Sequence, residues 1–93
     1  MIIGTLTIRL VIRGAYSLKD KRQVLKSLKD RLSNKFNVSV AEVDRQDDRQ
    51  QATLGVAMVG TDARVVNSAL SKLIDHVRCA PGAELVDYEL EMF

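Results

Sequence analysis

Hydrophobic and polar side chains alternate from Ile2 to Arg13, which is the pattern of a β-strand with one buried face. The alternation returns in residues 52–59 and is less regular in residues 38–44, where it indicates a bulge or burial on both faces. A last alternating segment covers residues 84–93. Its expected core face consists of Val86, Tyr88, Leu90 and Met92. The pattern therefore predicts four strands.

Two other segments repeat their apolar residues at helical spacing. The first runs from Ser17 to about Phe36, and its buried stripe is formed by Leu18, Leu25, Leu28, Leu32 and Phe36. Ser17 stands three residues before Asp20, an arrangement close to a capping box at a helix start. The second helix begins after Thr61 or Asp62 and ends before Pro81.

The resulting order, β-α-β-β-α-β, predicts one α+β domain of the ferredoxin-like type over residues 1–93. Right-handed crossovers place both helices on one face of a four-stranded antiparallel sheet. We expect the first and third strands to be central, adjacent and parallel. Strand parity assigns nine residues to the opposite, open face: Thr5, Thr7, Arg9, Thr53, Gly55, Ala57, Val59, Asp87 and Glu89.

The composition is that of a packed globular protein, with 46% hydrophobic and 28% charged residues. A single cysteine, Cys79, excludes an internal disulfide framework and favours a reducing compartment. The first residues lack the basic region of a signal peptide, and their apolar positions alternate with Thr and Arg. We therefore expect a cytoplasmic protein that does not enter a membrane.

Positive charge is concentrated in the first half of the chain. Residues 1–50 hold eleven Lys or Arg against six Asp or Glu, whereas residues 51–93 hold three against six. The overall net charge of +2 conceals this asymmetry. A local positive field can attract a polyanion even when the mean charge is small.

The first helix carries most of these cations. Arg22, Lys26 and Lys29 fall within a narrow arc beside the apolar stripe, with Lys19 next to them. Lys21 falls at the angle of the stripe itself and is expected to reach over the end of the sheet. Phosphate-backbone binding needs such a ridge, although a solvated surface is the alternative. The predicted nucleic-acid contacts are Lys19, Lys21, Arg22, Lys26, Lys29, Arg45 and Arg49.

The turn before this helix is a candidate anion site, because a helix N-terminus offers free N–H groups. Its predicted ligands are Ser17, Lys21 and Arg22. Neither the P-loop spacing nor the Rossmann fingerprint is present, and no nucleophile stands beside a base. Acylphosphatases use the same corner of this fold, so an anion-dependent enzyme remains an alternative, but we assign no catalytic residue.

We predict no metal and no cofactor. Asp44, Asp47 and Asp48 lack the glycine and terminal glutamate of a calcium loop. His76 and Cys79 are too few to make a zinc site, and Cys79 is expected to be partly buried.

Aromatic residues are too few for bases to stack across the sheet. The small residues of the open face could instead pack against another sheet in a dimer. The acidic last strand could also meet a basic surface of another subunit.

Three runs resemble the YlxP-like family of small bacterial proteins with a domain of unknown function: residues 17–22 (SLKDKR), 24–28 (VLKSL) and 36–44 (FNVSVAEVD). The resemblance implies a ferredoxin-like fold. Genes of the family often lie near those for translation initiation and ribosome maturation, which implies a role with RNA or ribosomal particles. Family members often carry an aromatic residue, commonly Trp, near the position of Arg49, where a guanidinium plane can still stack.

The leading interpretation is therefore a non-enzymatic, RNA- or ribosome-associated binding protein. A homo-oligomeric interaction module is the alternative from a different class.

Overall fold

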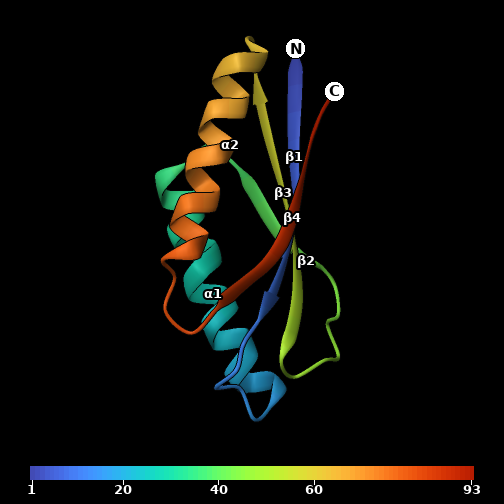
Figure 1. The fold of residues 1–93 in the computed structure, drawn as a ribbon, viewed down its shortest axis with the longest axis vertical. Helices are drawn as coiled ribbons and strands as arrows, with labels where there is room; N and C mark the ends of the chain where they lie inside the picture. The colour runs from blue at the N-terminus through green and yellow to red at the C-terminus, as the bar shows by residue number, and fades with distance from the viewer.

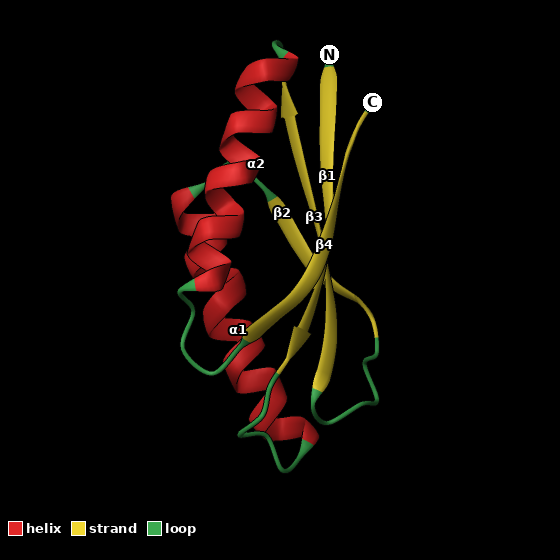
Figure 2. Cartoon of the chain, in the orientation of Figure 1, coloured by secondary structure: helices red, strands yellow, loops and turns green.

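The computed structural model describes all 93 residues. The elements follow the predicted order: β1 (Ile2–Val11), α1 (Leu18–Lys35), β2 (Ser39–Asp44), β3 (Gln51–Gly60), α2 (Ala63–Arg78) and β4 (Glu84–Met92). Both helices cover one face of the sheet, and the other face is left open (Figures 1 and 2). The ferredoxin-like α+β prediction is confirmed. Neither helix is long and apolar enough to cross a membrane.

The expected direction of the two central strands is wrong. The strand order is β2-β3-β1-β4, and β1 runs antiparallel to both β3 and β4. The α1 crossover makes β2 parallel to β1, but a hairpin then reverses the chain into β3. Because β3 inserts between β2 and β1, it must be antiparallel to each of them.

Each edge strand contains an irregularity. In β2 the pairing with β3 shifts between Glu42 and Asp44, which shows that a bulge, the first of the two predicted alternatives, is present and leaves Val43 as the extra residue. In β4 the pairing with β1 shifts between Arg9 and Leu10, so Val86 is left unpaired and its side chain is 60% exposed. The expectation that Val86 faces the core is therefore corrected; the neighbouring Leu85 packs there instead.

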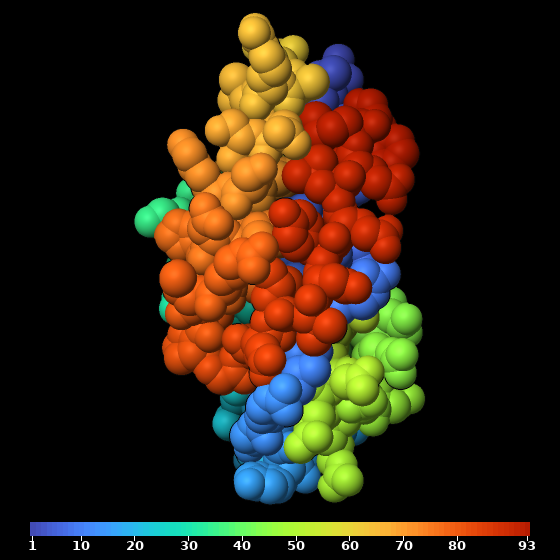
Figure 3. All heavy atoms as spheres, viewed as in Figure 1, coloured from blue at the N-terminus to red at the C-terminus, as the bar shows by residue number.

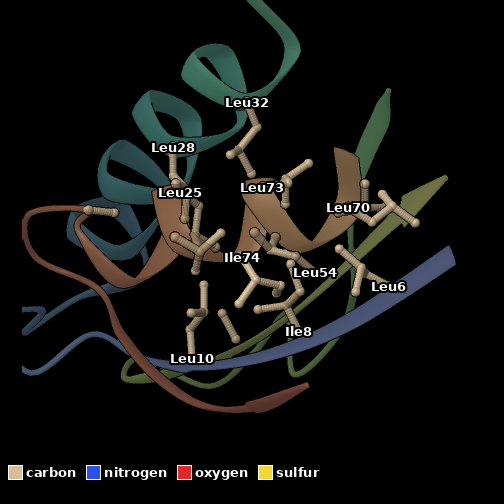
Figure 4. Packing of buried hydrophobic residues seen from close by; sticks show 14 of the residues in the cluster. Leu6, Ile8, Leu10, Leu25, Leu28, Leu32, Leu54, Leu70, Leu73 and Ile74 are labelled. Atoms are coloured by element: carbon tan, nitrogen blue, oxygen red, sulfur yellow. The ribbon is translucent and has the colours of Figure 1, made fainter. Parts of the chain in front are cut away.

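The core lies between the sheet and the two helices (Figure 4). Its central side chains are at most 2% exposed and come from β1, α1, β3 and α2: Leu6, Ile8, Leu10, Leu25, Leu28, Leu32, Leu54, Leu70, Leu73 and Ile74. Each contributes about 1.5–3 kcal/mol by leaving water. The predicted stripe of α1 is thus its buried face, although Leu18 and Phe36 at its two ends are only half-buried.

Helix α2 approaches β1 most closely at Gly4. A Cβ atom on Gly4 would stand 2.6 Å from Val66 Cγ1 and 2.7 Å from Leu70 Cδ1. Real Cβ atoms do not approach carbon this closely, so a side chain on Gly4 would displace the Val66 and Leu70 side chains from their present packing.

Lys21 is the least expected residue of the fold, because its long side chain is completely buried. Its Nζ donates to the backbone carbonyls of Arg45 at 2.7 Å, Gln51 at 3.1 Å and Gln46 at 3.5 Å. The Oε2 atom of Glu42 lies 2.8 Å away on the helix-facing side of β2. That oxygen has no well-directed hydrogen bond, so the attraction of opposite charges holds it in place.

This arrangement corrects the expectation that Lys21 contacts a bound anion. Its ammonium group points into the protein and fixes the β2–β3 loop against α1. Lys21 therefore belongs to the structure beneath the surface and has no exposed atom with which to reach a phosphate.

Substitution of Gly4 tests the close approach of α2. We expect Gly4→Ala to lower the free energy of unfolding by about 1–3 kcal/mol, because the new methyl group overpacks the contact. Gly14→Ala is the matched control, since no atom lies within 4 Å of its added Cβ. Urea unfolding measures both variants, and equal stability of the two would contradict the assignment.

Substitution of Lys21 tests the buried ion pair. Lys21→Met leaves the Glu42 carboxylate buried without a counter-charge, and we expect a loss of about 3–5 kcal/mol in unfolding free energy. Adding Glu42→Leu removes the uncompensated charge and should restore part of that loss, though not the bonds to the loop carbonyls. Denaturant titration measures the unfolding free energy of the two variants. A Lys21→Met protein as stable as the wild type would contradict the structural role of the ion pair.

Candidate nucleic-acid interface

The N-terminus of α1 is capped by its own chain. Ser17 Oγ accepts a hydrogen bond from the Asp20 amide at 3.1 Å, and Asp20 Oδ2 accepts one from the Tyr16 amide at 3.2 Å. The Ser17 half of the predicted capping box is present, but Asp20 accepts from the Tyr16 amide instead of the amide of the N-cap residue Ser17. The three predicted anion ligands are not assembled, because Ser17 is engaged as a cap, Lys21 is buried and only Arg22 is exposed. That prediction is corrected.

The remaining predicted cations of α1 do form a ridge. Lys19, Arg22 and Lys26 are exposed and Lys29 is half-buried. None of Lys19, Arg22 and Lys29 forms an ion pair within the chain. From Lys19 to Lys29 the ridge extends about 15 Å, at about 1.5 Å per helical residue. We call these four residues the α1 ridge.

Lys26 is the one member of the α1 ridge with an internal partner. Its Nζ lies 3.1 Å from Asp30 Oδ2, one helical turn away, and both side chains are largely exposed. An exposed pair of this kind contributes only about 0.2–1 kcal/mol. Lys26 can therefore exchange Asp30 for an external phosphate at little cost.

The β2–β3 loop is attached to the turn before α1. Arg49 Nη1 donates to the Tyr16 carbonyl at 3.4 Å, and the Gln50 side-chain amide donates to the Ala15 carbonyl at 3.5 Å. In Figure 3 this loop and the β1–α1 turn lie against each other at the lower end of the molecule. Exposed Arg45 and Arg49 are thereby brought to the end of the protein where the α1 ridge begins.

The acidic residues of this loop have a structural role. Asp48 Oδ1 accepts the backbone N–H groups of Gln50 and Gln51, each at 2.8 Å, and these bonds hold the pKa of Asp48 below its usual value. Asp44 Oδ1 accepts the amide of Arg45, whose φ of 64° is left-handed. No group of three His, Cys, Asp or Glu side chains is placed to hold a metal ion.

A second basic surface was not predicted. Arg31, Lys35 and His76 line a hollow of about 660 Å³ between α1 and α2, with Leu28 and Leu32 at its floor. Arg31 lies about 160° around the helix from Lys29, so the α1 ridge is on the flank turned away from α2. The i, i+4 spacing of Arg31 and Lys35 was the available signal, but the sequence does not show which flank faces the other helix.

Cys79 is exposed at the end of α2, contrary to the expectation of partial burial. It directly follows the helix as its C-cap, where the chain turns outward. The ring of nearby His76 stands edge-on to Phe36 with centroids 5.4 Å apart, so this histidine packs against an aromatic ring.

Solved structures share this fold at low sequence identity. SnoaB, a cofactor-independent oxygenase from Streptomyces nogalater, superposes with a TM-score of 0.56 at 15% identity, covering 98% of this chain and 90% of that one. The designed protein Foldit4 gives a TM-score of 0.55 at 9% identity, covering 100% and 97%. At such identities the likeness concerns the fold alone.

Sequence relatives give a closer relationship. Uncharacterized protein YlxP of Bacillus subtilis (strain 168) is 34% identical over 91 residues, which are 98% of this chain and 99% of the relative. Residues 3–90 match the family described as "Protein of unknown function (DUF503)". The chain therefore belongs to the DUF503 family, as the YlxP-like motifs indicated.

Proposed function

We propose that this protein binds RNA through phosphate contacts along the α1 ridge and the adjoining β2–β3 loop, without catalysing a reaction. The observation that carries the proposal is the position of the ridge. Lys19, Arg22, Lys26 and Lys29 flank the buried stripe of α1, so a polyanion can reach them without disturbing the core. The resemblance to proteins encoded beside ribosome-maturation genes favours RNA among polyanions.

The positive charge of the β2–β3 loop also supports the proposal. Arg45 and Arg49 extend the ridge at its N-terminal end, and Lys21 holds their loop in place from below. Exposed Lys and Arg side chains contact phosphate oxygens and carry little information about base sequence. Tyr16 is 79% exposed in the same turn and is the one aromatic ring near these cations. We therefore propose binding with weak sequence preference.

Salt dependence is the expected signature. On single strands, the logarithm of the binding constant falls by about 0.7 per phosphate contact for each tenfold rise in salt. Four to six contacts would give a slope of about −3 to −4. Mobility shifts with ribosomal RNA fragments at several salt concentrations measure it.

Charge reversal on the α1 ridge provides the specific test. The double variant Arg22→Glu/Lys26→Glu should bind ribosomal RNA about 10–100-fold more weakly, with a shallower salt slope, since phosphate contacts are lost. The matched control is Arg64→Glu/Lys72→Glu, which changes net charge equally on exposed positions of α2. If both variants lose the same RNA affinity, net charge and not the α1 ridge explains the effect. RNA binding that is unchanged by salt and by both substitutions would refute the proposal.

A further inference from the structure

The open face of the sheet exposes apolar side chains around a shallow centre. Four large hydrophobic residues lie on it with 54–67% of their surface exposed: Val43, Val59, Val86 and Phe93. Between them, small side chains line a hollow of about 400 Å³, among them Thr5, Thr7, Ala41, Gly55 and Ala57. An exposed apolar surface of this kind marks a site of protein contact.

The arginine in the middle of this face, Arg9, is already paired within the sheet. Arg9 donates to Asp87 at 2.7 Å and to Glu89 at 3.1 Å. These hydrogen bonds raise the pKa of Arg9 above its ordinary value. Glu91, opposite Thr5, adds a further carboxylate. The one cation without an ion pair on this face is Arg45, at its edge beside Val43, so the face as a whole suits a polyanion poorly. Its partner is a surface of mixed apolar and small polar residues.

The size of the face matches a dimer contact. Strands β1 and β3 are each 10 residues long, which gives about 33 Å at about 3.3 Å per residue. Four strands about 4.8 Å apart make the face about 15–19 Å wide. Because β2 has only 6 residues, the footprint is at most about 500–600 Å², which reaches only the lower limit of the about 600–1,000 Å² that each partner buries in a specific interface.

We propose that a second copy of this chain covers the open face, sheet against sheet, in a two-fold dimer. The chain's own open face has the length of the surface to be covered, and a two-fold axis brings the same apolar patch from both copies together. The inference does not depend on RNA binding, because the helices and the α1 ridge remain on the outside of such a dimer (Figure 1).

Sedimentation equilibrium of the full chain across micromolar concentrations tests the proposal. We expect a dimer for the wild type and at least about 100-fold weaker association for Ala57→Glu, which places two carboxylates at the centre of the contact. Ser71→Glu adds the same charge on the exposed surface of α2 and should dimerise as the wild type does. A monomeric wild type, or an Ala57→Glu protein that dimerises normally, overturns the proposal.

Two further measurements keep the result unambiguous. If circular dichroism shows that Ala57→Glu is unfolded, Val59→Ser replaces it, since that side chain is 55% exposed in the single chain and its loss leaves the core intact.

High salt distinguishes the sheet contact from pairing of the α1 ridge with the acidic β4 of a neighbour. The apolar contact persists in salt, whereas an exposed ionic one is screened. A dimer that dissociates in salt contradicts the sheet-to-sheet arrangement.

Discussion

The buried ammonium group of Lys21 determines how the basic surface is built. A lysine has three donors, and here they face three backbone carbonyls and one carboxylate inside the protein. Removing this charge from water is costly, and the cost is offset only because its donors find oxygen partners. Since two of those carbonyls belong to the β2–β3 loop, the ammonium fixes Arg45 and Arg49 relative to α1. A buried cation thus positions the exposed ones.

One-sided coverage of the sheet is the second constraint. Both helices lie on the same face of the sheet, as right-handed crossovers require, and the core forms only there. The helical layer then presents the cations, while the opposite face presents paired charges and apolar side chains. The two surfaces differ in the partners they suit. Under the two proposals, the first surface would bind phosphates and the other would bind a second protein surface.

The sequence predicted the elements well because local periodicity determines them. The alternation from Ile2 and the stripe through Leu25, Leu28 and Leu32 each report which face is buried, and the structure agrees. Val86 was misplaced because a bulge changes parity at a position set by pairing with β1, which is information from a distant strand. Lys21 was misjudged for a related reason. Its angle on α1 placed it in the buried stripe. The oxygen atoms that bind its buried ammonium group come from residues 42–51, which are distant in sequence.

The same limit applies to the functional surface. Counting cations along the sequence gave seven candidate nucleic-acid contacts, and burial removes Lys21 from them. Arg31, Lys35 and His76 line a hollow that the sequence pattern did not predict. If the open faces pair, the two α1 ridges lie on opposite sides of a body about 50 Å thick, since one molecule measures 20 Å across its layers and packed sheets lie about 10 Å apart. One short phosphate backbone cannot cover both ridges without bending around the dimer. A dimer would therefore bridge two segments of RNA, and the gain from holding both depends on how flexibly those segments are joined.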